Sequence, residues 1–432
     1  MQSNVIASNR PIPPRVMAVM RRMSRSRWAT LAMLLFGLLG LSACGSRPGP
    51  VAAKSAVAKN TPSPSNVAAA SGSSAARSSG SSSSGILLYA VVESHTKTNG
   101  LATYDTVAIA GLDGYARAKT TFTPATPPYV GCLGPLLPLE AHVAAGRVFY
   151  VDGKGIVRSL GLDKTVKQAA AFPIGPQQEV SFAVSPDGRH LLGTVLTIPP
   201  KPATDPCTSQ GNGFAPGNWS EDVYAADAGG ASRLISHRSW PAGQQADVLS
   251  FVGWDAIGPL GTSPTGYGTQ GGGPIREGWY GRVVRVDAAT GGIQRQLGTD
   301  TCYADDVAVG GSYVCSGQDS IDVFNPDGSP SWKFSAPNQG YMVPLLSPDL
   351  RHVEALGPMI VGKDGSSTPI GNPQPNGPSD FYAGGWLDAQ TVIGWHNSGS
   401  TYNEMTIVRL SAPSKLVDLG FQGTFVGVVQ SG

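Results

Sequence analysis

The chain has 432 residues, and its 31 basic and 29 acidic side chains give a formal net charge of +2. All of the basic excess lies in the first 84 residues, because residues 85–432 carry 21 basic and 29 acidic side chains. A mildly acidic domain lacks the concentrated positive charge with which proteins bind nucleic acid, so we expect no nucleic-acid partner.

Residues 1–43 have the organisation of an export signal. They contain six Arg and no acidic residue, and their apolar run from Trp28 to Leu41 is shorter than the roughly 20 residues that span a bilayer. Leu41-Ser42-Ala43-Cys44 resembles the lipobox of bacterial lipoproteins. The resemblance implies cleavage before Cys44 and lipidation of that residue. An ordinary secretory signal with an incidental cysteine is the alternative.

Residues 44–84 form the second predicted region, a lipidated Cys44 followed by a tether. The segment is rich in Ser, Ala, Gly and Pro and contains no aromatic residue. Such a composition cannot bury enough apolar surface to offset the entropy lost on ordering. Several acyl chains hold a protein stably on a bilayer. We therefore expect a protein of the cell envelope, anchored to a membrane on its extracytoplasmic side.

Residues 85–432 are predicted to be one all-β domain built from a repeat. Ser185-Pro186-Asp187-Gly188-Arg189-His190 lies between two apolar β-type runs, and Ser347-Pro348-Asp349-Leu350-Arg351-His352 repeats it. Pro presets φ, Asp bonds its own backbone and Gly accepts positive φ, so each stretch predicts the tight turn of a hairpin. The recurrence indicates an internal repeat of the kind found in propellers.

Each repeat unit reads as four short strands, and seven units fit the chain. The first unit, from Ile86 to Thr123, lacks its inner strand, whereas Gly423–Gln430 at the C-terminus is one strand too many. The surplus strand completes the first blade and closes the ring, which leaves only short, protected strand edges. We predict a seven-bladed β-propeller, with six or eight blades as alternatives, that acts as a monomeric domain.

The repeated turn resembles those of TolB-like and WD-repeat-like propellers. Gly253-Trp254-Asp255 and Gly385-Trp386-Leu387-Asp388 occupy the equivalent turn in two other units. The resemblance implies the fold and carries no catalytic residue, so we interpret these Trp and Asp residues as turn and inter-blade packing groups.

Four cysteines remain in the domain, an even number that favours two disulfides in an exported protein. The blade assignment places Cys302 and Cys315 in one hairpin, and it places Cys132 and Cys207 in loops on the same face. We therefore predict the pairs Cys302–Cys315 and Cys132–Cys207. The spacings do not match a zinc site, and we expect no metal or other cofactor.

No recognised catalytic motif occurs in the chain, and the six His are scattered. A propeller enzyme, such as a lyase, a lactonase or a glycan hydrolase, nevertheless remains an alternative. It would have to use polar residues at the mouth of the channel, namely Glu140, His142, Asp305 and Asp306.

The longest predicted loops are Thr123–Glu140, Thr197–Glu221, Ser263–Tyr280 and Gly371–Asp380, and the blade assignment puts all four on one face. Long loops on a rigid scaffold are where binding residues concentrate. Their aromatic and charged side chains are our candidate ligand-binding residues: Tyr129, Phe214, Trp219, Tyr267, Arg276, Trp279 and Tyr280. Aromatic side chains suit a protein, peptide or glycan partner. We expect a binding or scaffolding module; an accessory lipoprotein of an envelope assembly complex is a further alternative, and so is a set of loops that only plug the channel.

Overall fold

The structure is a computed structural model in which the described residues are 87–93, 96–98, 101–125, 141–200, 218–242, 248–263, 282–299, 302–307, 310–317, 319–336, 344–355, 359–371, 380–396 and 404–430. The chain divides into two units, Met1–Ser79 and Gly80–Gly432, and every described residue belongs to the second. The described residues form strands and turns, and none of them belongs to a helix long and apolar enough to cross a membrane.

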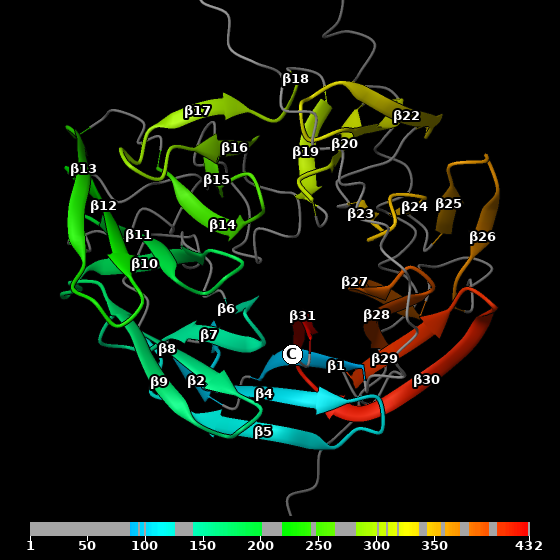
Figure 1. The fold of residues 1–432 in the computed structure, drawn as a ribbon, viewed down its shortest axis with the longest axis horizontal. Helices are drawn as coiled ribbons and strands as arrows, with labels where there is room; N and C mark the ends of the chain where they lie inside the picture. The colour runs from blue at the N-terminus through cyan, green and yellow to red at the C-terminus, as the bar shows by residue number, and fades with distance from the viewer. Residues whose placement is uncertain are drawn as a thin grey trace, which may run out of the picture. The chain divides into compact units, whose positions relative to one another are not determined.

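Seven antiparallel sheets stand around a ring, and each sheet is one blade of a propeller (Figure 1). From inner to outer strand, blades 1 to 3 consist of β31 (Thr424–Val429), β1 (Leu88–Glu93), β4 (Thr106–Gly111) and β5 (Ala116–Thr121); β6 (Ala141–Ala144), β7 (Arg147–Val151), β8 (Ile156–Gly161) and β9 (Val166–Ala171); and β10 (Gln178–Val184), β11 (His190–Thr197), β12 (Trp219–Asp227) and β13 (Arg233–Trp240).

The other four blades follow in chain order. They consist of β14 (Ser250–Trp254), β15 (Pro259–Ser263), β16 (Arg282–Val286) and β17 (Ile293–Gln296); β18 (Gly298–Thr299), β19 (Cys302–Val307), β20 (Tyr313–Gly317), β21 (Ser320–Phe324) and β22 (Pro330–Ser335); β23 (Leu345–Leu346), β24 (His352–Ala355), β25 (Met359–Gly362) and β26 (Ser367–Pro369); and β27 (Phe381–Asp388), β28 (Thr391–His396), β29 (Glu404–Arg409) and β30 (Ala412–Gln422).

The prediction of seven blades is confirmed, and so is the closure by the C-terminal strand. β31 pairs antiparallel with β1, from Leu88 opposite Val429 to Val92 opposite Thr424, and the two strands lie side by side in Figure 1 in red and blue. Two elements were not predicted. A hairpin of β2 (Thr96–Thr98) and β3 (Leu101–Thr103) interrupts blade 1, and β18 adds a fifth strand to blade 5.

The core lies between the blades because each strand presents alternate side chains to its two neighbouring blades. In β7, Val148 and Tyr150 pack against blade 1, whereas Phe149 and Val151 pack against blade 3. Apolar side chains therefore bury themselves on both faces of the same strand. A blade by itself would leave both faces exposed, so the blades stabilise each other around the ring.

The repeated turn has the same hydrogen bonds in both copies. Ser185 Oγ donates to Asp187 Oδ1 at 2.5 Å and accepts from the His190 backbone N–H at 2.9 Å. Ser347 Oγ makes the equivalent bonds to Asp349 at 2.6 Å and from His352 at 2.9 Å. The Ser and Asp side chains of the motif thus accept hydrogen bonds from backbone N–H groups of the turn, which supports a structural role for the motif.

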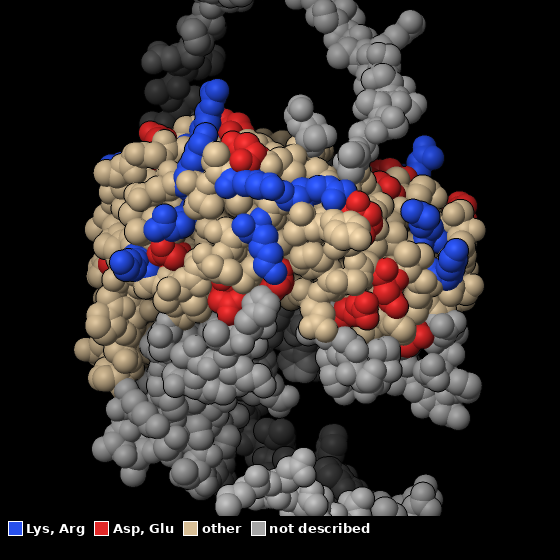
Figure 2. Space-filling view, turned by 90° about the horizontal axis from the view of Figure 1, so that it is seen from below, with Lys and Arg blue, Asp and Glu red and all other residues tan. Residues whose placement is uncertain are grey.

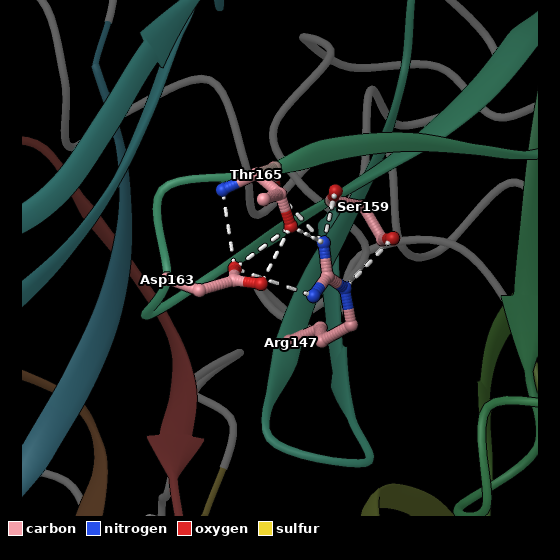
Figure 3. Close-up of polar contacts among 4 residues, drawn as sticks. All are labelled: Arg147, Ser159, Asp163 and Thr165. Carbon is pink, nitrogen blue, oxygen red and sulfur yellow. Dashed lines mark hydrogen bonds and ion pairs between the residues drawn. The ribbon is translucent and has the colours of Figure 1, made fainter.

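Turns between the third and outer strands are stabilised by charged side chains, as blade 2 illustrates (Figure 3). The Arg147 guanidinium donates to Ser159 Oγ at 3.0 Å and to the Thr165 carbonyl at 2.8 Å, and it lies 3.6 Å from Asp163. Asp163 in turn accepts from the backbone N–H and hydroxyl of Thr165. These contacts tie the second strand to the turn of its own blade.

Charged side chains are scattered over the side of the ring that Figure 2 shows, with basic and acidic groups near one another. In blade 1, Arg117 of β5 pairs with Asp113 at 2.5 Å, and Lys119 of β5 pairs with Glu93 at 2.9 Å. Charges on exposed strand edges disfavour pairing with another chain. The mixture of signs makes this side an ordinary solvated edge rather than a basic stripe.

Candidate functional site

The ends of the blade strands define two faces of the ring. On the loop-bearing face, second strands end, third strands begin and outer strands lead to the next blade; on the turn face, the repeated Ser-Pro-Asp turns occur. The segments 126–140, 201–217, 264–281 and 372–379 all leave described strands at the loop-bearing face. The prediction that the long connections share one face therefore agrees with the order of the strands.

Most of the candidate residues lie outside the described residues: Cys44, Tyr129, Cys132, Glu140, Cys207, Phe214, Tyr267, Arg276, Trp279 and Tyr280. Asp305 and Asp306 lie in β19, where only the backbone is described. His142, at the start of blade 2, is half-buried and meets the Phe182 ring edge-on at 4.8 Å. Of the four residues that a propeller enzyme would have to use, only His142 has a described side chain, and that side chain packs against a core aromatic ring.

Trp219 is the one candidate binding residue whose side chain is described. It begins β12 at the loop-bearing face, directly opposite Trp240 of β13, and only 5% of it is exposed. Trp240 is less buried, and the Arg238 guanidinium lies 5.6 Å from its ring centroid. Of the two rings, that of Trp240 is therefore the more exposed, and it has a cation beside it.

A buried carboxyl group, that of Glu221, lies next to this aromatic pair. It accepts hydrogen bonds from Arg238 and from the Leu249 backbone N–H, the latter at 2.5 Å. Burial raises the pKa of Glu221 to about 7, against the opposing effects of Arg238 and the Leu249 hydrogen bond. This group was not among the predicted site residues, because Glu221 fell at the end of the predicted loop Thr197–Glu221, where a Glu is expected to be a solvated charge.

A narrow cleft opens between blades 1 and 2 at the loop-bearing face, with room for about one water molecule. Its lining carries no charged side chain and consists of Val92, Tyr104, Phe122, Pro124, Ala141, Tyr150 and Val151. The Phe122 and Tyr150 rings lie 4.7 Å apart at an angle of 38°, and the Tyr104 hydroxyl donates to Thr424 Oγ1 at 3.2 Å. Burial raises the pKa of Tyr150, partly offset by a hydrogen bond to Thr120.

The cleft is too small to enclose a ring-shaped group. Its aromatic side chains can contact a partner only through their exposed edges. Sequence reasoning missed these residues because it looked for aromatics only within the long loops. Tyr104 and Phe122 instead lie next to strand ends, and the strand assignment alone would have placed both on the loop-bearing face. Among the described side chains, no three His, Cys, Asp or Glu residues are grouped so that they could hold a metal ion.

Comparisons with known proteins concern the fold. No protein-family model matches the chain, and no curated protein does. Among solved structures, the chain is similar to the oligogalacturonate lyase from Vibrio parahaemolyticus, with 9% identity, a TM-score of 0.41 and coverage of 74% of this chain and 90% of that one. It is also similar to the Dos1 propeller, with 8% identity, a TM-score of 0.40 and coverage of 79% and 85%.

A third similar structure is that of putative TolB from Agrobacterium tumefaciens, with 12% identity, a TM-score of 0.32 and coverage of 79% of this chain and 92% of that one. At these identities the likeness extends to the fold and to nothing finer. The chain is a seven-bladed all-β propeller, and its activity has to be argued from its own loop-bearing face.

Proposed function

We propose that the chain is a binding or scaffolding module that holds a protein, peptide or glycan partner on the loop-bearing face of its propeller. The observation that carries the proposal is the gathering of aromatic side chains there. The uncharged cleft of Tyr104, Phe122 and Tyr150 lies on this face, and so does Trp240 with its neighbouring Arg238. Aromatic side chains and Arg dominate the energetics of protein interfaces, and aromatic rings also stack on sugars.

We further propose that the module is exported and anchored to a membrane through lipid on Cys44, on the extracytoplasmic side of the cell envelope. The support is the basic segment, the apolar run and the Leu41-Ser42-Ala43-Cys44 sequence, followed by a segment that is suited to be a tether. Such an anchor would leave the propeller free to present the loop-bearing face to a partner.

Binding is tested with the full chain, solubilised in detergent and used as bait for extracts and for a glycan array. Tyr104→Ala removes a partly exposed ring of the cleft and is expected to weaken partner binding about tenfold or more. Tyr115→Ala is the matched control, since Tyr115 is 70% exposed on the turn face. The proposal fails if the wild-type chain retains no specific partner or if the two variants bind equally well.

Anchoring is tested separately by palmitate labelling and membrane fractionation of cells that produce the chain. Cys44→Ser is expected to abolish the label and move the protein to the soluble fraction. Cys132→Ser, the control, is expected to keep both the label and the association with the membrane. A labelled Cys44→Ser chain would refute lipidation at this position and leave the binding proposal standing.

A further inference from the structure

The junction between blades 3 and 4 depends on one buried carboxyl group. Glu221 lies in β12, the third strand of blade 3, and its side chain is completely buried. One oxygen accepts from Arg238 of the neighbouring strand, and the other accepts from the backbone N–H of Leu249, which leads into blade 4. The carboxyl group therefore joins an outer strand of one blade to the inner strand of the next.

Blade 4 depends on such side chains because β14 is the innermost strand of its sheet and pairs only with β15. On the free edge of β14, and at Leu249 just before it, backbone N–H groups point away from the sheet and require hydrogen-bond partners elsewhere. Glu221 satisfies the N–H of Leu249, and Ser181 Oγ satisfies that of Phe251 at 3.0 Å. Both acceptors come from blade 3, so the polar contact is built into the packing of the two blades.

The charged groups around Glu221 come from three described strands. Arg238 on β13 faces it directly and is one-third exposed. Asp222, the next residue along β12, pairs with His237 at 2.6 Å. Glu179 on β10 lies opposite Leu196 of β11, and Leu196 in turn lies opposite Glu221. From blade 4, the described contact is the Leu249 backbone, which carries no net charge.

Burial and neighbouring charges oppose each other at this position. Burial disfavours the ionised carboxylate and is the largest effect, Asp222 adds to it, and Arg238 and the Leu249 N–H favour the ionised form. The balance raises the pKa of Glu221 to about 7. The proton is therefore taken up or released in the neutral range rather than at the acidic pH at which an exposed Glu titrates.

We propose that Glu221, Arg238 and Leu249 form a pH-responsive contact between blades 3 and 4, in which protonation of the carboxyl group releases Arg238 at the loop-bearing face. A neutral carboxylic acid still offers its carbonyl oxygen to the Leu249 N–H but no longer attracts the guanidinium. Arg238 then turns toward solvent and alters its position over the Trp240 ring. The blades stay together while the surface beside Trp240 changes its charge.

The test is a pH titration of the indole N–H signals of Trp219 and Trp240 by NMR, in the full chain without any partner. In the wild-type chain the Trp240 signal is expected to shift with a midpoint near pH 7. Glu221→Gln is expected to remove this shift. His237→Asn is the matched control, because it replaces a neighbouring side chain on β13 that pairs with Asp222 rather than with Glu221.

A second variant covers the case in which Glu221→Gln does not fold. Arg238→Gln removes both the cation that favours the carboxylate and the group that moves over Trp240. In this variant the midpoint is therefore followed by the ¹³C carboxyl signal of Glu221, and it is expected to move to higher pH by about one to three units. The proposal is overturned if the midpoint survives in Glu221→Gln, disappears in His237→Asn or is unchanged in Arg238→Gln. Because no ligand takes part, these outcomes are independent of whether the loop-bearing face binds a partner.

Discussion

At the scale of single residues, Glu354 shows how burial alone changes the chemistry of a carboxyl group. It lies in β24, where 5% of it is exposed, opposite Leu345 and Ile360 in the apolar junction between blades 6 and 7. Burial is the cause that raises its pKa to about 8. Unlike Glu221, it faces no cation among the described side chains, and it therefore becomes increasingly destabilising as the pH rises above about 4.5.

We expect Glu354→Gln to stabilise the protein increasingly as the pH rises. Below pH 4.5 the folded and unfolded carboxyl groups both carry a proton, so the variant and wild type differ little. Between pH 4.5 and 8 the unfolded chain releases a proton that the folded chain retains, and wild-type stability falls by up to roughly 5 kcal/mol relative to the variant.

Urea unfolding at pH 4.5, 6 and 8 measures this difference. Glu404→Gln is the control, since it removes a carboxyl group from a partly exposed position on β29. If the free energy of unfolding of Glu354→Gln runs parallel to that of the wild type over this range, burial does not control the ionisation of Glu354.

The repeated turn offers a second residue-scale prediction. Gly188 has φ of +72°, and a Cβ there would lie 3.1 Å from the Ala145 Cβ. Gly188→Ala should therefore cost about 1–2 kcal/mol of unfolding free energy. Gly253→Ala is the matched control, because nothing lies within 4 Å of its added Cβ. Equal thermal stability of the two variants would contradict the argument.

Leu350 occupies the equivalent position in the other copy of the turn and has φ of +61°. Its backbone carbonyl accepts from the Trp332 indole at 3.2 Å, and its side chain packs against the core between blades 5 and 6. The strain of a left-handed Leu is thus offset by side-chain packing that a Gly could not provide, whereas the carbonyl contact needs only the backbone. The two copies of the turn therefore use different residues, Gly188 and Leu350, for the same left-handed backbone, because the side chains that surround them differ.

At the scale of elements, the blade strands were predictable because period-two alternation and turn residues mark them directly. The turns at Ser185 and Ser347 fell where expected, and the C-terminal strand predicted at Gly423–Gln430 is observed as Thr424–Val429. The hairpin of β2 and β3 was missed, since it interrupts blade 1 outside the four-strand pattern. β18 was missed because two residues carry no periodicity.

The candidate site was less predictable than the fold. Sequence patterns identify aromatics in loops, but the cleft of Tyr104, Phe122 and Tyr150 forms where two blades meet. Likewise, Trp219 looked like a loop residue and is a buried strand residue. Which rings are buried depends on how neighbouring blades pack, and that is a long-range property that a local pattern does not contain.

The disulfide prediction for blade 5 belongs to the hairpin of β19 and β20. Ala304 lies opposite Cys315, and Cys302 lies two residues before Ala304 on the same face of the sheet. Cys315 is fully buried and is not a free thiol. The partner predicted for it is Cys302, with Cys132 and Cys207 forming the second pair.

Peptide mapping without reduction checks both pairs, and we expect each predicted pair to appear as one linked peptide. Cys302→Ser should leave Cys315 reactive toward iodoacetamide and cost about 3 kcal/mol of stability, as expected for a bond that closes a short loop. Recovery of Cys315 linked to Cys132 or Cys207 would refute the pairing.

At the scale of the whole molecule, the closure by β31 determines whether the seven blades form one cooperative unit. β31 forms the inner edge of blade 1, and Phe425 packs with blade 7 residues in the same apolar cluster as Tyr89. The first and last parts of the chain are therefore joined by backbone hydrogen bonds and by a shared core. Blade 1 alone among the blades takes strands from both ends of the chain.

We expect a chain truncated after Gly423 to lose this cooperativity. It lacks β31, which exposes the inner edge of β1 and removes the buried side chains of Phe425, Val426 and Val429. Burial of each such side chain stabilises by about 1.5–3 kcal/mol, so the midpoint of thermal unfolding should fall by about 10 °C or more. A chain that ends at Gln430 keeps β31 and is the control.

The same truncated chain distinguishes a missing strand from a general loss of folding. A synthetic peptide of residues 423–430, added in excess, should pair with the free edge of β1 by strand addition and raise the unfolding midpoint again. A peptide in which Phe425 is replaced by Asp keeps the backbone hydrogen bonds but cannot enter the core, and it should not restore stability. If the truncated chain melts like the control without any peptide, the ring is held together by contacts between blades and not by its closing strand.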